Sequence, residues 1–453
     1  MTERFSLELA WLPSAQGLKE DQLTAAALRI AFPDGIATRV RDMWSQTVLD
    51  SVQVSAYPLA LWFASSWWRL RWEPRTGPYS TDWLMSHDMR AAGHGFIWPP
   101  LRFESDGEII EALYRPDSRA KEPVRYLGRF NATIAASEFE RSIDDFVGRV
   151  LERLTDAGMP QTELRHLWNE VMEERHHPEI TARRRLEAQL GFDPDEAPDQ
   201  IFTRLATLVI EAGQDAVSEI APALEKNDLS ASLAQTIEIA HSPGIRVRIS
   251  PDRGFVDQRR HDYEAAVPWE RGRLLAQDAR NSWSLSGDSL KDEELSQILE
   301  IPSSVFDTAK AQSATMGLAV RKNGELSLHF RGEPRYSPRV ARYSRRFECA
   351  RFIADDLLAV NDRWLPATDT PTARQKMQRA FAAEFLCPIE SLKSYLKGDY
   401  SEERIKDAAV HFAVPTVLVK SQLANHGLIP RFPSRRAFPG FRHRGSRPTG
   451  SPP

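Results

Sequence analysis

The sequence predicts an α+β protein with several domains, and three observations lead to this expectation. The chain has 453 residues, whereas a single domain usually has roughly 150. Eight of the 12 tryptophans lie within the first 98 residues, so the first third differs chemically from the rest. Apolar residues alternate with polar ones in some segments and recur at helical spacing in others. Both strands and helices are therefore expected.

Residues 1–158 are predicted to form a Trp-rich α+β domain that serves recognition or sensing. Phe5, Leu7, Leu9 and Trp11 alternate with polar or small residues, as in a half-buried strand. The pair Asp106-Gly107 predicts a hairpin turn between strands over 101–104 and 108–114. The remaining elements expected here are helices over 58–72, 80–90 and 137–154 and a strand over 126–135.

Residues 159–265 are predicted to form a helical linker domain, and residues 266–430 a mostly helical domain with a small antiparallel sheet. In the linker domain, apolar positions recur at helical spacing over 162–174, 179–190, 199–212 and 229–241. In the last domain, two strands are expected around Asn323-Gly324. Its expected helices cover 269–281, 292–299, 345–360, 372–386, 389–396, 402–412 and 416–426.

Charge and composition narrow the class of protein. The formal net charge of −4 excludes a uniformly basic nucleic-acid coat protein. Two cysteines, Cys349 and Cys387, cannot build a disulfide framework. We find neither a secretion signal nor an apolar run of membrane-spanning length, so a cytoplasmic protein without membrane contact is expected. Residues 431–453 contain six Arg and no acidic residue, which predicts a basic, disordered tail.

Three blocks of the last domain resemble the ImmA/IrrE family of metallopeptidase-like proteins. The first block, 346–358, is similar to the family's Arg-Phe followed by Ala-His-Glu-x-x-His on a helix. The second, 380–388, is similar to its Phe-Ala-Ala-Glu-Leu-Leu-Met-Pro segment. The third, 405–429, is similar to its closing helix pair, which ends Leu-Gly-Leu-Ile. The resemblance covers about 160 residues and implies a zincin-like fold.

The family's zinc chemistry requires two His at i and i+4, a Glu between them and a third acidic ligand. This chain departs from that pattern at every position. Arg351 and Asp355 stand at the histidine positions, Phe352 at the Glu position, and Met377 near the acidic ligand. Arg has no lone pair for a metal, so the resemblance implies a metal-free relative without a catalytic residue, metal or cofactor. Since Arg351 and Asp355 share one helix face, we expect them to form an ion pair.

A second candidate site lies in the Trp-rich domain. Trp67 and Trp68 are followed by Arg69 and Arg71. Aromatic rings interleaved with Arg can stack on nucleic-acid bases, although packing of these residues in a core explains the same pattern. We therefore retain Trp67, Trp68, Arg69 and Arg71 as a candidate binding surface.

The leading hypothesis from the sequence is a cytoplasmic, prokaryotic regulatory or sensor protein. Its degenerate ImmA/IrrE-like domain would bind a protein partner, such as a repressor or antitoxin encoded by a neighbouring gene, in a stress-response or phage-defence setting. Two alternatives remain open. One is an active zinc endopeptidase with relocated ligands that cleaves a regulatory protein. The other is a nucleic-acid-binding module that uses the Trp/Arg surface and the basic tail.

Overall fold

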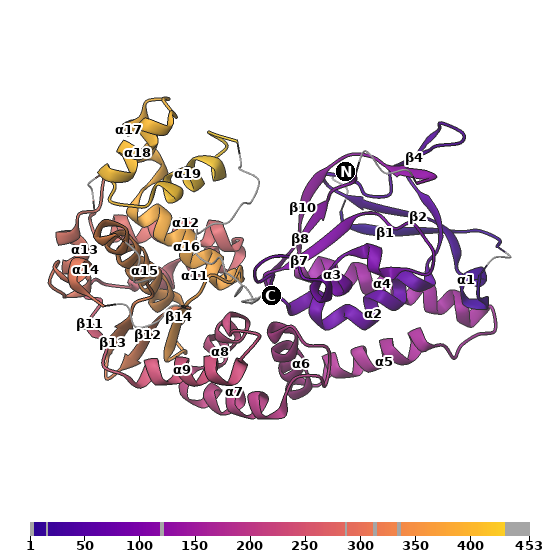
Figure 1. Cartoon of the computed structure of the whole chain (residues 1–453), viewed down its shortest axis with the longest axis horizontal. Coiled ribbons are helices and arrows are strands. Elements are labelled where there is room, and N and C mark those ends of the chain that lie inside the picture. Colours follow the sequence, from indigo (N-terminus) through magenta and orange to yellow (C-terminus); the bar gives the residue numbers. More distant parts are fainter. Residues whose placement is uncertain are drawn as a thin grey trace, which may run out of the picture.

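The protein has a multi-domain α+β structure, as the sequence predicts. The computed structural model describes residues 4–14, 17–117, 122–285, 288–310, 315–332 and 337–430, so the predicted disordered tail at 431–453 lies outside the described residues. Figure 1 shows an N-terminal unit on the right, a C-terminal unit on the left, and an arc of helices below that connects them. Within the described residues, no helix combines the length and apolar character needed to cross a membrane.

The N-terminal unit contains small antiparallel sheets that pack on helices. Its strands are β1 (Ser6–Trp11), β2 (Ala25–Phe32), β3 (Gly35–Ile36), β4 (Val40–Asp42), β5 (Val48–Leu49), β6 (Val52–Ser55), β7 (Leu101–Ser105), β8 (Ile109–Tyr114), β9 (Val124–Tyr126) and β10 (Phe130–Ala135). Strand β2 pairs with β1, β3 and β6, β8 pairs with β7 and β10, and β4 pairs with β5 and β9. The helices are α1 (Lys19–Leu23), α2 (Tyr57–Trp72), α3 (Thr81–His87) and α4 (Ala136–Asp156).

Helix α2 is the central helix of this unit. Pro58 stands in its first turn, where its missing N–H costs no hydrogen bond. Most of its side chains are buried, on all sides of the helix, because α3, α4, α5 and β7 surround it. A helix that is apolar all round belongs in a core. The densest Trp segment of the sequence is therefore the middle of the N-terminal core.

The connecting arc is helical. It consists of α5 (Glu163–His176), α6 (Pro178–Leu190), α7 (Asp199–Ala212), α8 (Gln214–Ile220) and α9 (Leu229–His241). Helix α5 packs against α2 of the N-terminal unit. Residues of α7, α8 and α9 share an apolar core with the C-terminal sheet. The arc is therefore divided between its two neighbours.

The C-terminal unit surrounds one four-stranded antiparallel sheet in the order β11–β13–β12–β14. Its strands are β11 (Ile245–Val247), β12 (Gly317–Lys322), β13 (Glu325–His329) and β14 (Trp364–Ala367). Its helices are α10 (Gly254–Gln258), α11 (Arg260–Ala265), α12 (Pro268–Ser282), α13 (Asp292–Leu299), α14 (Val305–Thr308), α15 (Pro338–Leu358), α16 (Ala373–Leu386), α17 (Ile389–Leu396), α18 (Glu402–His411) and α19 (Thr416–Asn425). Strand β11 precedes position 266, so the sheet includes a segment that the sequence placed in the linker domain.

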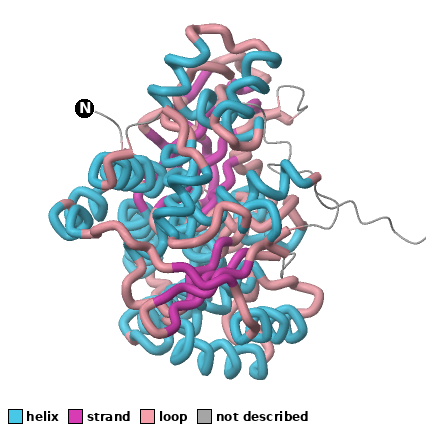
Figure 2. Tube along the Cα trace, turned by 90° about the vertical axis from the view of Figure 1, so that its left-hand side faces the viewer, coloured by secondary structure: helices cyan, strands magenta, loops and turns pink. Residues whose placement is uncertain are grey.

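Both faces of this sheet are covered by helices (Figure 2). Successive side chains of a strand point to opposite faces. Leu318 and Val320 of β12 join the core of the connecting helices, whereas Ala319 between them joins the core that contains α15. The sheet thus holds α15 on one side and links it to the connecting arc on the other.

The hairpin β7–β8 joins the N-terminal unit to the C-terminal unit. Lys376 of α16 donates to Asp106 Oδ2 and to Glu111 Oε1, both at 2.8 Å. Arg271 of α12 donates to both carboxylate oxygens of Glu108 at 2.9 and 2.8 Å. The predicted Asp-Gly turn is therefore confirmed as a hairpin, and its tip is the docking point of the two units.

Candidate functional site

Helix α15 carries the residues that resemble the metallopeptidase motif, and α16 packs beside it. The helix begins at Pro338, earlier than the sequence predicts, because Ser337 Oγ accepts a hydrogen bond from the backbone N–H of Val340. Nearly all residues from 346 to 357 are buried between the sheet and α16. Every charged side chain in that half of the helix therefore needs a partner inside the protein.

Arg351 and Asp355 do not form the ion pair that the sequence predicts. Arg351 is 3% exposed, and its guanidinium donates to the amide oxygens of Gln375 and Gln378 and, at 2.7 Å, to the carbonyl oxygen of Thr368. Burial lowers the pKa of Arg351 to about 9. The correction has a geometric cause, since α16 places amide oxygens directly against the guanidinium.

Asp355 pairs instead with Arg374 of α16. Arg374 Nε and Nη2 lie 2.7 and 2.6 Å from the two carboxylate oxygens of Asp355, and its Nη1 lies 2.5 Å from Asp362. Such a bidentate pair is stronger and more directional than a single contact. Burial alone lowers the pKa of Arg374, but the carboxylates of Asp355, Glu219 and Asp362 raise it above the ordinary value.

The two remaining motif positions belong to the apolar core. Phe352 and Met377 are 1% and 4% exposed and pack in the core of the C-terminal unit. The residues of α16 that contact the motif positions are Arg374, Gln375 and Gln378. Guanidinium, phenyl and primary amide groups do not form the His and carboxylate set that zinc requires. These residues therefore do not fit the metal that the resemblance implies.

Glu348, one turn before Phe352, is a buried carboxyl group without a role in the family motif. Its carboxylate accepts a hydrogen bond from the backbone N–H of Arg331 at 2.9 Å. Burial raises the pKa of Glu348 to about 7, although the Arg331 side chain opposes this shift. Glu348 is therefore a buried carboxyl group whose pKa lies near neutral pH.

Relocated zinc ligands are not found in the part of the chain that the structure describes. Within those residues, no group of three or more His, Cys, Asp or Glu side chains is placed to hold a metal ion. His329, a histidine close in sequence to α15, is buried, and burial lowers its pKa to about 4. It stands opposite Leu318 in the sheet, on the face that covers the connecting helices.

The four residues of the second candidate site lie in the interior. Trp67, Trp68, Arg69 and Arg71 are 2%, 3%, 2% and 9% exposed. Trp67 packs edge-on against Trp168 of α5, and the other three make polar contacts. Trp68 Nε1 donates to Glu174, Arg69 pairs with Glu73 and Asp82, and Arg71 pairs with Glu140. The expected binding surface is therefore wrong, because the rings of Trp67 and Trp68 are buried and cannot stack on a base.

An arginine-rich pocket lies at the C-terminal end of α15, and the sequence did not point to it. Its volume is about 350 Å³. It is lined by the segment after β11, the β12–β13 turn, the end of α15 and the residue before β14. Arg248, Arg253, Arg321, Lys322 and Arg363 line it together with two carboxylates, Glu325 and Asp356. The pocket is therefore strongly cationic.

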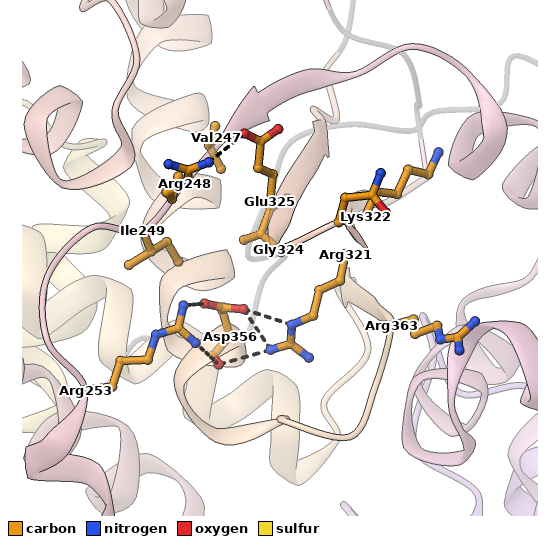
Figure 3. A pocket seen from close by; sticks show the side chains of 12 residues that line it. Val247, Arg248, Ile249, Arg253, Arg321, Lys322, Gly324, Glu325, Asp356 and Arg363 are labelled. Carbon is orange, nitrogen blue, oxygen red and sulfur yellow. Dashed lines mark hydrogen bonds and ion pairs between the residues drawn. The ribbon is translucent and has the colours of Figure 1, made fainter.

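Asp356 organises the inner wall of this pocket. Arg253 and Arg321 approach it from opposite sides (Figure 3), at 2.5 Å for Arg253 Nη2 and 2.8 Å for Arg321 Nη2. Arg321 also donates to the carbonyl oxygen of Ala359 at 2.6 Å. Arg248 pairs with Glu325 at 3.1 Å on the opposite side. In the sequence these basic residues are spread over four separate segments, so no one segment indicates that they form a pocket.

No protein-family model, curated protein or solved structure matches this chain.

Proposed function

We propose that this chain is a regulatory protein whose C-terminal unit is a catalytically degenerate relative of the ImmA/IrrE metallopeptidases and binds a protein partner. The surroundings of Arg351 give the strongest support. This residue stands where the resemblance implies a zinc-binding histidine, yet its guanidinium is buried and bonded to Gln375, Gln378 and Thr368. Arg351 is therefore part of the packed, hydrogen-bonded interior of the C-terminal unit.

The chemistry of the neighbouring positions supports the loss of hydrolysis. Phe352 has no group that accepts a proton from water, so it cannot replace the Glu that activates the metal-bound water in the family. Asp355 is held by two of the three guanidinium nitrogens of Arg374. A carboxylate engaged in this way is not available as a metal ligand unless Arg374 moves.

The packing of the three blocks supports the kinship. Residues of α15, α16, α18 and α19 contribute to one apolar core, together with the hairpin β12–β13. Cys349 and Cys387 are buried within that core, and burial raises the pKa of both thiols. These cysteines therefore serve packing in the proposal, rather than metal binding or redox chemistry.

Trp44 is the residue of the Trp-rich unit that best suits contact with a partner. It follows β4 on the hairpin that projects at the upper right of Figure 1 and is 90% exposed. Val48 and Leu49 of the same hairpin are 43% and 47% exposed. Asp42 Oδ1 accepts hydrogen bonds from the backbone N–H groups of Trp44 and Ser45, which fixes the turn. Exposed Trp residues are frequent centres of binding energy in protein interfaces.

Co-expression with the protein encoded by the neighbouring gene tests this proposal. The full chain and that protein should co-elute in size-exclusion chromatography, and mass spectrometry should find the partner uncleaved. Trp44→Ser should weaken the complex by at least about tenfold, whereas Trp269→Ser, at a second exposed Trp in α12, serves as the control. Zinc-dependent cleavage of the partner, or the absence of a complex, would contradict the proposal.

A further inference from the structure

The pocket beside Asp356 has an excess of positive charge that the fold itself does not neutralise. Arg253 and Arg321 share the single carboxylate of Asp356, so two guanidinium groups face one negative charge. Arg248 is balanced by Glu325. The shared carboxylate leaves the inner wall one positive charge in excess.

Two further cations stand at the edge of the pocket, beyond Arg321 (Figure 3). Lys322 Nζ donates to the neutral carbonyl oxygen of Ala240 at 3.2 Å. The Arg363 side chain is exposed and has no hydrogen-bond or ion-pair partner among the described residues. The backbone N–H of Arg363 donates to Ala212 at 2.9 Å, so the position of the residue is fixed while its side chain remains available.

The geometry of the pocket indicates the kind of ligand. Its volume of about 350 Å³ lies at the small end of ordinary small-molecule sites. Its lining has no aromatic ring on which a base could stack. Planar guanidinium groups match the oxygens of phosphate groups. A compact anion with several charges suits this combination better than a neutral or extended ligand.

We propose that this pocket binds a small molecule carrying two or more phosphate groups. Arg253 would contact the ligand from the inner wall, and Lys322 and Arg363 would draw it in from the edge. Arg321 holds the end of α15 through Asp356 and Ala359, so it positions the wall. Asp356 directly follows the motif position Asp355 in α15, but none of the zinc-motif positions lines the pocket. Binding of a ligand there does not require the proposed partner.

Isothermal titration of the full chain with inorganic pyrophosphate and with ATP tests this inference. Wild-type protein should bind pyrophosphate at one site, and Arg253→Gln and Arg363→Gln should each weaken binding by at least about tenfold. Arg260→Gln is the matched control, because Arg253 and Arg260 are both 44% exposed and both paired with an Asp. Thermal unfolding without ligand confirms that each variant is folded.

Several outcomes would overturn the inference. Absence of pyrophosphate and ATP binding would do so, as would equal weakening in Arg260→Gln. If both Arg253→Gln and Arg363→Gln still bind pyrophosphate as tightly as wild type, other cations bind it, such as the six Arg of 431–453. Equal affinity for citrate would show that the pocket binds small anions in general and does not select phosphate. Tighter binding of single-stranded RNA would show that the ligand is a nucleic acid and not a small molecule.

Discussion

Arg374 and Asp355 form a bidentate ion pair that connects α16 to α15, with nitrogen–oxygen distances of 2.7 and 2.6 Å. Asp355 is 1% exposed and Arg374 12% exposed at their side chains. The position at which the family resemblance implies a zinc ligand is thus a structural contact between two helices. The stability of the C-terminal unit should depend on it.

Arg374→Met should lower the free energy of unfolding by about 3–5 kcal/mol, because it leaves Asp355 buried without its partner. Urea denaturation followed by circular dichroism measures this loss. Lys393→Met, which removes the exposed pair with Glu390 on α17, should change stability by at most about 1 kcal/mol. Equal effects of the two substitutions would show that the pair does not hold the helices together.

Gly272 marks the close crossing of α12 and α16. A Cβ atom at Gly272 would lie 2.2 Å from the carbonyl oxygen of Met377 and 2.8 Å from the backbone nitrogen of Phe381. Gly272→Ala should therefore destabilise the protein by about 1–3 kcal/mol, since backbone atoms must move.

Gly148→Ala is the matched control for that substitution. Gly148 lies in α4, and a Cβ atom there meets no other atom within 4 Å. Alanine should raise stability by about 0.5–1 kcal/mol, because glycine is costly inside a helix. The two substitutions should thus have effects of opposite sign in the same thermal-unfolding measurement. Stabilisation by Gly272→Ala would be incompatible with the helix crossing described.

Glu348 should make stability depend on pH. Burial raises its pKa to about 7 from 4.5, so the folded chain keeps the proton while the unfolded chain loses it. The protonated Glu348 therefore stabilises the fold fully below pH 4.5, and this stabilisation is lost as the pH rises through 7. The loss amounts to at most about 3 kcal/mol of unfolding free energy. The difference in unfolding free energy between Glu348→Gln and wild type should therefore grow in favour of the variant from pH 5 to pH 8.

Chemical denaturation of both proteins at a series of pH values measures this difference. Glu390→Gln, at an exposed carboxylate of α17, controls for the loss of one charge. A difference between Glu348→Gln and wild type that is the same at pH 5 and pH 8 would show that the carboxyl is not held in its protonated form.

Lys376 should couple the N-terminal and C-terminal units. Its ammonium group contacts Asp106, which is 1% exposed at its side chain, and Glu111. Lys376→Met should weaken the docking of the β7–β8 hairpin, so that one cooperative urea transition separates into two. Hydrogen exchange should increase at the β7–β8 turn in the same variant. A single transition with an unchanged midpoint would mean that other contacts, such as Arg271 with Glu108, are sufficient.

The sequence predicted elements whose signals are local. The helix over 58–72 matches α2, and the turn residues Asp106-Gly107 and Asn323-Gly324 each lie between paired antiparallel strands. Strands β2 and β6 were not predicted. Strand β2 pairs with the nearby β3 as well as with β1 and β6, but short apolar runs do not distinguish a strand from other buried segments.

The candidate sites depended on contacts between elements, which sequence spacing does not contain. Helical spacing of i and i+4 predicted an ion pair between Arg351 and Asp355. In the structure each of them bonds instead to a residue of α16, Arg351 to Gln378 and Asp355 to Arg374. Aromatic and Arg residues at helical spacing fit a core and a nucleotide-binding surface equally well, and α2 uses them for a core. The cationic pocket combines residues from four segments, so no single segment identified it.

The zinc content of the purified full chain tests the central claim most directly. Protein incubated with zinc and freed of unbound metal should hold far less than one zinc per chain by elemental analysis, and Asp355→Ala should leave that value unchanged. One zinc per wild-type chain that disappears in Asp355→Ala would contradict the account, because Asp355 would then be a metal ligand and the unit a metal-dependent enzyme.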